Sequence, residues 1–453
     1  MPTVTNPLDA PLAPRAYRGP IMHSLSAEEL RFLPNGGLLV NADGRVEACE
    51  NWSTLQATGR LEGVEVLSLP PDALLVPGFV DMHVHLPQME VAGCQEKNLL
   101  SWLEQHIFAA EARFTDANHA QNVSQWFFEE LLRNGTTTAA VFLTSHDEAT
   151  RIAFETAERL GNRVIMGQNL MDANAPAALV KPAEQLLQET EAQCRQWHGR
   201  DQGRLQYAWI PRFAITSTEE LLAGIGELRR RYPDVYLHTH LSEQIPEIEA
   251  VKNLFPWAKD YTDVYEKFGL LGPRTILAHG IHLSDDELDR IQAAESSLAH
   301  CPSSNFFLKS GRFRLFEILR RKMRFGLGSD VGAGPELSMF KVMKDGQFMQ
   351  TEALAPLNAL FYAATLGGAK ALFQDDRIGN FEPGKEADFL ILDLRGKTCM
   401  ALPNASQQDT VSALTVEGGS HALLSKLIYL GDERLVQSGF IRGRRVYQAG
   451  LIP

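Results

Sequence analysis

The segment Leu74–Gln88, LLVPGFVDMHVHLPQ, decides how the rest of the chain is interpreted. Its first half is apolar and typical of a buried β-strand, with a break at Pro77-Gly78. His83 and His85 follow where this strand would end. Residues two apart in an extended backbone point to the same side, so both imidazoles can reach one metal ion. The alternative is an exposed strand with two hydrogen-bonded structural histidines.

Length, composition and charge narrow the class of protein. The 453 residues are enough for one large domain and one smaller domain. Hydrophobic residues make up 44% of the chain and charged residues 22%, as in ordinary globular proteins. The formal net charge of −13 argues against a nucleic-acid partner, which would require a basic surface. No run of about 18 apolar residues occurs, so we expect no membrane span.

The cysteines and the N-terminal segment indicate the cellular compartment. The 5 cysteines are scattered and form no Cys-x-x-Cys pair, which argues against a disulfide framework and a cysteine-rich zinc site. The N-terminal segment is rich in proline and has no apolar core of the kind found in signal peptides. We therefore expect a cytoplasmic protein.

The order of strand-like and helix-like segments predicts an α/β protein with two domains. Between residues 74 and 377, apolar strands alternate with longer helical segments, which is typical of a (β/α)8 TIM-type barrel. The expected barrel strands are Leu74–Asp81, Thr136–Leu143, Arg163–Asn169, Arg204–Ile210, Val235–Leu241, Thr275–His279, Ser297–His300 and Arg324–Asp330. Residues 1–73 and 378–453 contain short strands and turns, so we expect a small β-sandwich domain built from both chain ends.

Residue types that bind metals recur at the ends of the expected barrel strands, where the active sites of such barrels lie. The fifth strand ends in His238 and His240, and Glu243 follows closely. The sixth strand ends at His279 and the eighth at Asp330. Each residue alone has a structural explanation, such as a buried histidine bonded to a carbonyl. Four such strand ends on one rim, counting the first, favour a metal site.

The expected ligand set is rich in nitrogen and contains one carboxylate, which suits Zn²⁺ and also Fe²⁺. A divalent ion of this kind lowers the pKa of a bound water from about 15.7 to about 7. Glu243, near the expected ligands but not needed as one of them, is the natural general acid or base.

Four motifs resemble the metal-binding motifs of the amidohydrolase superfamily: Pro77–His85 (PGFVDMHVH), His238–Glu243 (HTHLSE), Leu277–Gly280 (LAHG) and Gly328–Asp330 (GSD). Three further elements are similar to those of the guanine deaminase family: His85–Gln88 (HLPQ), Pro211–Ala214 (PRFA) and Ala299–Asn305 (AHCPSSN). The resemblance covers nearly the whole chain, including the β segments at both ends.

The resemblance implies roles for individual residues. One zinc ion per chain, with iron possible, would be held by His83, His85, His240 and Asp330. The implied catalytic residues are Glu243, His279 and Asp330, and the implied substrate-binding residues are Gln88, Arg212, Phe213 and His240. Two-metal members of the superfamily use a carboxylated lysine at the end of strand four, and Arg204–Arg212 contains no lysine. The family dimerises, so a homodimer is implied, and His238 is expected to be a structural neighbour of the ligands.

The implied reaction is hydrolysis of guanine to xanthine and ammonia, a step of purine catabolism. Hydroxide could attack the amino-bearing carbon C2, Asp330 could take the proton of the water, and Glu243 could protonate N3 and then help proton transfer to the leaving amine. Arg212 offers donors to the O6 carbonyl, Gln88 can read an amide edge, and Phe213 can stack on the ring. These last three residues also have structural explanations, as a rim salt bridge, a loop residue and a core aromatic respectively.

Two alternatives stay open. The same metal motifs occur in aminohydrolases for other purines, pyrimidines or triazines, and only Gln88, Arg212 and Phe213 favour guanine. A non-catalytic scaffold that kept the barrel would lose metal ligands, and here all of them are present. The zinc motif of cytidine deaminases, His-x-Glu with Pro-Cys-x-x-Cys, is absent from the sequence.

Overall fold

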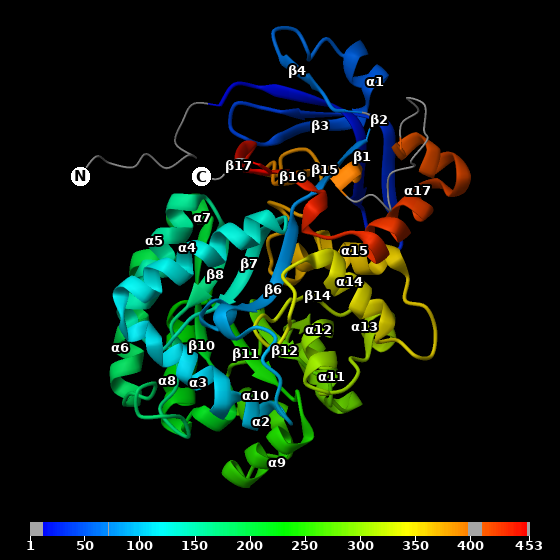
Figure 1. The fold of residues 1–453 in the computed structure, drawn as a ribbon. Coiled ribbons are helices and arrows are strands. Elements are labelled where there is room, and N and C mark those ends of the chain that lie inside the picture. Colours follow the sequence, from blue (N-terminus) through cyan, green and yellow to red (C-terminus); the bar gives the residue numbers. More distant parts are fainter. Residues whose placement is uncertain (1–11, 71, 397–409, 451–453) are drawn as a thin grey trace, which may run out of the picture.

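Both ends of the chain meet in a mixed β-sheet that lies beside a barrel formed by the middle of the chain (Figure 1). The computed structural model describes residues 12–70, 72–396 and 410–450. Within those residues, no helix combines the length and the apolar character needed to cross a membrane. The predicted α/β barrel, accompanied by a β unit drawn from both chain ends, is confirmed.

The mixed sheet has the strand order β17-β16-β15-β5-β1-β2-β3, and β4 also pairs with β1. The bounds are β1 Arg15–Ser24, β2 Leu30–Val40, β3 Val46–Asn51, β4 Glu65–Ser68, β5 Ala73–Pro77, β15 Phe389–Asp393, β16 Val436–Ile441 and β17 Arg444–Gln448. Hydrogen bonds link these strands into one sheet, because β5 pairs with both β1 and β15. This sheet folds over on itself, since the ring of Tyr17 in β1 lies 5.7 Å from that of Phe440 in β16, although β5 and β15 separate the two strands in the sheet.

The barrel strands run parallel in the order β6-β7-β8-β10-β11-β12-β13-β14, with the short β9 beside β10. Their bounds are β6 Phe79–His85, β7 Thr136–Phe142, β8 Arg163–Gly167, β9 Asn169–Leu170, β10 Leu205–Pro211, β11 Tyr236–Leu241, β12 Thr275–His279, β13 Ser297–His300 and β14 Phe325–Leu327. Each of the eight strands expected for the barrel has a counterpart here, although the bounds of several differ by a few residues.

The first expected strand, Leu74–Asp81, is wrong as a single element. Its apolar half is β5 of the mixed sheet, and the barrel strand begins only at Phe79. The chain turns at Gly78, where a Cβ atom would lie 2.1 Å from the Thr137 side-chain oxygen. Only glycine allows the two sheets to approach so closely at this point. The domain boundaries after residues 73 and 377 stay predictions.

Helices between the strands surround the barrel (Figure 1). Side chains cap several of them: Thr218 caps α8, and Ser284 and Glu287 form a reciprocal capping box at α11. The helices that follow the barrel strands are α4 Ala117–Arg133, α5 Asp147–Leu160, α6 Ala183–Trp197, α7 Arg200–Gly203, α8 Glu219–Arg231, α9 Ile245–Leu254, α10 Tyr261–Lys267, α11 Asp285–Ala293, α12 Pro302–Phe307, α13 Leu315–Arg321, α14 Met339–Phe348, α15 Leu357–Ala363 and α16 Leu366–Ala371.

Shorter helices and one longer helix complete the described chain. They are α1 Trp52–Ala57, α2 Leu99–Trp102, α3 Phe108–Ala112, α17 Thr410–Leu430, the 3-10 turns η1 Leu86–Val91, η3 Arg113–Thr115, η4 Ala214–Thr216, η5 Leu394–Gly396 and η6 Glu433–Leu435, and the π-helical turn η2 Leu103–Ile107. Helix α17 packs on α14 and α15. The sequence predicted only strands and turns after residue 378, so this helix was missed.

A bulge in β6 turns the two histidines of the opening segment into the barrel. Strict alternation would place Met82 and Val84 on the same face of the strand. Met82 instead packs with residues of neighbouring strands in the barrel interior, and Val84 packs in the outer core. The pairing of β6 with β7 shifts register between Asp81 and Val84. Bulges of this kind re-aim side chains, and here the shift lets His83 and His85 follow Met82 inward.

Backbone hydrogen bonds join β6 to the segment after β14 and close the rim of the barrel. The Asp330 amide donates to His83 O at 2.8 Å, and the His85 amide donates to Val331 O at 2.8 Å. Gly328 permits this approach, because a Cβ atom there would lie 2.9 Å from His83 Cβ. The first and the last strand therefore meet at the residues expected to bind the metal.

A buried ionic network joins the barrel to the mixed sheet at the amino-terminal ends of the barrel strands, opposite the rim that carries the expected metal ligands. Arg163, the first residue of β8, donates to Asp388 at 3.0 Å and also pairs with Glu386. Arg442, in the turn between β16 and β17, donates to the same Glu386 at 2.9 Å. All four side chains are buried. Their charges compensate one another, so removal of one leaves another unpaired inside the protein.

Arg163→Ala should therefore lower the free energy of unfolding by about 3–5 kcal/mol, as expected when one partner of a buried ion pair is removed. Chemical denaturation of the purified variant measures this. The control is Arg151→Ala, because Arg151 pairs with Glu148 and Glu155 on the exposed face of α5. That variant should lose less than about 1 kcal/mol. Equal losses would contradict the fastening role of the buried network.

Candidate active site and metal centre

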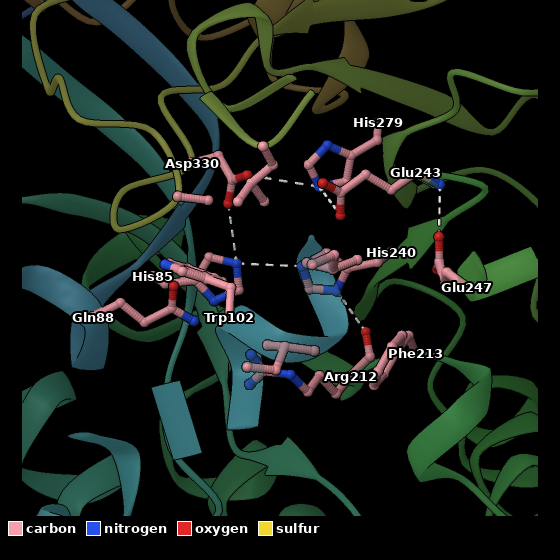
Figure 2. Close-up of a pocket in the computed structure, with 14 residues that line it drawn as sticks. His85, Gln88, Trp102, Arg212, Phe213, His240, Glu243, Glu247, His279 and Asp330 are labelled. Atoms are coloured by element: carbon pink, nitrogen blue, oxygen red, sulfur yellow. Dashed lines mark hydrogen bonds and ion pairs between the residues drawn. The ribbon is translucent and has the colours of Figure 1, made fainter. Parts of the chain in front are cut away.

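A pocket lies at the carboxyl ends of the barrel strands, where the sequence predicted the site (Figure 2). It is lined by His85, Gln88, Leu99, Trp102, Leu103, Arg212, Phe213, His240, Glu243, Glu247, His279, Leu308, Asp330 and Ala333. His83 lies directly behind this wall and is fully buried. The structure thus brings all the predicted site residues together, while their individual roles stay predictions.

Four donor atoms face one another in this pocket. His83 Nε2 lies 3.1 Å from His85 Nε2 and 3.2 Å from Asp330 Oδ1. His85 Nε2 lies 3.3 Å from Asp330 Oδ1 and 3.3 Å from His240 Nε2. Tetrahedral zinc ligands with bonds of about 2.0–2.1 Å are separated from one another by about 3.3 Å. Among the described residues, the ligand atoms of His83, His85 and Asp330 lie within 4.8 Å of one another, and those of His83, His240 and His279 form a second such group. The chemistry of these donors suits a small divalent ion.

Burial keeps the imidazoles neutral, as metal ligation requires. It lowers the pKa of His85 to about 3 and also lowers the pKa values of His83 and His240. His240 Nδ1 lies 2.6 Å from the backbone oxygen of Arg212 and must donate to it, because a carbonyl carries no proton. The other ring nitrogen of His240 therefore presents a lone pair to the cluster. Metal-ligating histidines commonly have this arrangement.

His238 supports the cluster from behind. Its Nε2 lies 2.8 Å from His83 Nδ1, so it orients that ring with Nε2 toward the other donors. Phe142, the last residue of β7, packs its ring 4.6 Å from that of His238 and 4.7 Å from those of His85 and His240. No feature of the sequence distinguishes Phe142 from the other apolar residues of a buried strand.

Asp330 has a lowered pKa although it is buried. Burial alone would raise this pKa, but the rings of His83 and His85, which lie 3.2 Å and 3.3 Å from Asp330 Oδ1, outweigh burial and hold it well below its usual value. The φ angles of Asp330 and His279 are +50° and +69°, which is the left-handed region that residues other than glycine rarely adopt. Backbone strain of this kind clusters at functional sites.

Asp81 joins β6 to the segment that carries Asp330. Its carboxylate accepts hydrogen bonds from the amide of Ser329 at 3.0 Å and from the amide of His83 at 3.1 Å. It also accepts the Ser329 hydroxyl. Burial raises the pKa of Asp81 to about 6. The sequence showed Asp81 only as part of a motif, because its partner lies 248 residues away.

Glu243 and His279 lie across the pocket from His85 (Figure 2). Glu243 Oε2 lies 3.5 Å from His279 Nε2, and the Ser310 hydroxyl donates to Glu243 Oε1 at 2.8 Å. Burial, followed by the negative charge of Asp330, raises the pKa of Glu243 to about 8. A carboxyl group that titrates near neutral pH suits a general acid or base.

Glu247 is a second buried carboxylate in the same wall. It accepts the amides of Glu243 at 2.7 Å and Gln244 at 3.1 Å, where helix α9 begins. Burial and the neighbouring Glu243 raise its pKa to about 7. The spacing of Gln244 and Glu247 matches a capping box, so the sequence contained a signal for this residue. Ser310 offered no such signal, because it lies in a loop far along the chain.

The predicted substrate residues Gln88 and Arg212 meet at Glu111, a residue that the sequence analysis missed. Arg212 donates to Glu111 Oε1 at 2.6 Å, and Gln88 Nε2 donates to the same oxygen at 3.2 Å. Gln88 Oε1 accepts the amide of Gly332 at 3.3 Å. Nothing in the sequence around Glu111 distinguishes it from an exposed glutamate of a short helix.

Apolar side chains from the segment after β6 form another wall of the pocket. Leu99, Trp102 and Leu103 pack with Phe213 in one buried cluster. Leu103 also begins the π-helical turn η2, a geometry that is frequent near functional sites. The pocket therefore combines an apolar wall that suits a flat ring with polar groups that can orient it.

The purified protein should carry about one divalent transition-metal ion per chain, as the single donor cluster requires. His85→Ala should retain less than about a tenth of that amount, because it removes one donor in four. His282→Ala is the control, since His282 Nε2 bonds Ser310 O at 2.8 Å, outside the donor cluster. Mass spectrometry of the metal content measures all three. A full complement of metal in His85→Ala, or a wild-type protein that binds no metal when it is supplied, would contradict the proposed metal site.

Comparisons with protein families, with curated sequences and with solved structures all find amidohydrolases, among them guanine deaminases. The model of the amidohydrolase family matches residues 74–446. The guanine deaminase of Escherichia coli (strain K12) is 39% identical over 427 residues, which cover 93% of this chain and 93% of that protein. A solved structure of E. coli guanine deaminase has a TM-score of 0.87 and 36% identity, over 97% of this chain and 100% of that chain. Guanine deaminase from C. acetobutylicum, solved with guanine bound in its active site, has a TM-score of 0.86 and 27% identity, over 96% of this chain and 100% of that chain.

Proposed function

The chain belongs to the amidohydrolase family and, within it, to the guanine deaminases, and we propose that His83, His85, His240 and Asp330 hold the metal ion with which it hydrolyses guanine to xanthine and ammonia. One observation carries this proposal. The four donor atoms face one another beside Glu243, a buried carboxyl whose pKa is raised to about 8. Ligands and a general acid or base therefore share one pocket, as metal-assisted hydrolysis requires.

A divalent ion bound by these donors supplies Lewis-acid chemistry and lowers the pKa of a water to about 7. The chain's own residues prepare the position of that ion. His83 is oriented by His238, and His240 is oriented by the backbone oxygen of Arg212. The neutral imidazoles and the ionised Asp330 are the protonation states that ligation needs.

The polar and apolar walls would orient the purine. A guanidinium has five N–H donors, and the bond to Glu111 leaves others of Arg212 free to bind the O6 carbonyl. Gln88 keeps one N–H and one lone pair for an amide edge after its bonds to Glu111 and Gly332. Phe213 and Trp102 supply apolar surface for the ring.

The proton transfers balance with the residues present. As the oxygen of water bonds to C2, Asp330 accepts a proton from that water and protonated Glu243 donates a proton to N3. His279, 3.7 Å from Asp330 Oδ2, lies where it can hydrogen-bond the attacking oxygen. Glu243, now ionised, takes the proton of the new C2 hydroxyl and passes it to the amino nitrogen, so that C2=O forms as the C2–N bond breaks and ammonia leaves. Asp330 then gives Glu243 the proton that it took from the water. The products are xanthine and ammonia, and both carboxyl groups return to their starting states.

We also propose that the native ion is zinc, with iron as the alternative, that two chains form a homodimer, and that the enzyme acts in the cytoplasm. The nitrogen-rich donor set supports zinc and iron alike. The homodimer rests on the resemblance to the family.

Ammonia release from guanine, adenine, 8-oxoguanine, cytosine and a triazine tests the substrate. We expect kcat/KM for guanine to exceed that for each other compound by at least about tenfold, because Arg212 and Gln88 lie where they can recognise a carbonyl and an amide edge. Deamination of adenine or a triazine without deamination of guanine would overturn the substrate and leave the metal chemistry in place.

Glu243→Gln should lower kcat by about 10²–10⁴-fold while the metal content stays unchanged, because the variant can no longer shuttle protons. Steady-state kinetics with guanine and metal analysis of the same preparation measure both. Glu249→Gln, on the exposed face of α9, is the matched control and should retain wild-type turnover. A fully active Glu243→Gln would remove this residue from the mechanism.

A further inference from the structure

Glu111 is a buried carboxylate to which the reaction above assigns no role. It lies in α3, has no exposed surface, and contacts both Gln88 and Arg212. We propose that Glu111 makes the pocket selective for a purine with a carbonyl group at C6, by fixing Arg212 and Gln88 in the positions that recognise it. This inference rests on the proposed function, because it concerns how the same pocket selects guanine.

Glu111 compensates the charge of a buried arginine. The Arg212 side chain is only 3% exposed, and its one ion pair in the described part of the chain is with Glu111. Asp330 and Glu243 line the same pocket and would attract a guanidinium that lacked its own partner. Glu111 compensates the charge of Arg212 from outside the pocket. The free N–H groups of Arg212 can then bind a neutral carbonyl oxygen instead of a catalytic carboxylate.

Glu111 also fixes the orientation of the Gln88 amide. Its nitrogen donates to Glu111 at 3.2 Å, and its oxygen accepts the amide of Gly332 at 3.3 Å. A carboxylate can only accept and a backbone amide can only donate, so these partners permit only one of the two amide orientations. Gln88 therefore presents a fixed pattern of one donor and one acceptor to the ligand.

Glu111 lies behind the residues that it holds. Glu111 is absent from the pocket wall, so it acts through the two residues that it holds and is a positioning residue. It comes from α3, whereas Gln88 comes from η1 and Arg212 follows β10, so one carboxylate ties three segments together. Phe108 of α3 also lies under Arg212, with 5.9 Å between its ring centroid and Arg212 Cζ.

The Glu111 carboxylate is costly to bury. Glu111 Oε2 is buried and makes no hydrogen bond within the described residues. A buried carboxylate with one unsatisfied oxygen is unfavourable for folding, and such groups call for an explanation. The need to compensate the charge of Arg212 and to orient Gln88 explains why a carboxylate is buried here. A glutamate with only a structural role would have no such explanation.

The test compares two substrates in Glu111→Gln. Guanine and 2-aminopurine carry the same amino group at C2, but only guanine has a carbonyl at C6. We expect kcat/KM for guanine to fall about 10–100-fold, mainly through KM, because a charge-assisted hydrogen-bond network is lost. The value for 2-aminopurine should fall less than about threefold, because that substrate offers no carbonyl to Arg212.

Controls separate positioning from general damage. Glu90→Gln removes a carboxylate that pairs with Arg113 at 2.8 Å outside the pocket. This variant should leave kcat/KM unchanged for both substrates. In an Arg212→Ala background, Glu111→Gln should add less than about a threefold further loss on guanine, because Glu111 acts largely through Arg212. Metal content and thermal midpoint are recorded for every variant.

Two further measurements keep the test decisive. Competitive inhibition by hypoxanthine, which has the C6 carbonyl, should weaken in Glu111→Gln, whereas inhibition by unsubstituted purine should not; this comparison needs no turnover of 2-aminopurine. If Glu111→Gln does not fold, Glu111→Asp takes its place. This variant keeps the charge, but its side chain is one methylene shorter, so it should lose part of the preference for guanine over 2-aminopurine.

The outcomes distinguish this inference from the function on which it rests. A wild type that releases no ammonia from guanine overturns the proposed function, whatever Glu111 does. If the wild type is active and kcat/KM of the Glu111 variants falls equally for guanine and 2-aminopurine, or falls for neither, the role of Glu111 is overturned. The proposed function is then unaffected.

Discussion

Two backbone hydrogen bonds between the first barrel strand and the segment after the last one hold this active site together. They join His83 to Asp330 and His85 to Val331, so the closure of the barrel and the assembly of the donor cluster are the same event. The bulge in β6 aims the histidines inward, and the carboxylate of Asp81 ties the two segments a second time. Since three of the four donors lie at this seam, the barrel cannot open there without dismantling the site.

The second constraint is the pairing of buried charges. Burial keeps the imidazoles neutral, and the donor cluster holds Asp330 ionised. On the other side of the pocket, Glu111 offsets the charge of Arg212 before any ligand arrives. The space between these groups can therefore receive a neutral purine without leaving an uncompensated charge in a low-dielectric interior. Glu243 remains the group whose raised pKa lets it change protonation during the reaction.

Much of this arrangement could be predicted from the sequence, because parallel barrel strands are buried on both faces and appear as short apolar runs. Strand ends carry the reactive residues in such barrels, so the histidines of β6 and β11 and Asp330 after β14 stood out. What the sequence could not reveal depends on contacts between distant segments. The division of the first strand at Gly78, the single mixed sheet, helix α17 and the pairing of Glu111 with Arg212 all arise only when the chain is folded.

The position of the metal ion in crystals of the purified protein tests the central claim most directly. We predict one anomalous-diffraction peak per chain, within about 2.0–2.2 Å of Nε2 of His83, His85 and His240 and of an Asp330 carboxylate oxygen. A peak that lies elsewhere in the chain, or two peaks in the pocket, would contradict an account in which the closing strands of the barrel assemble a single-metal centre.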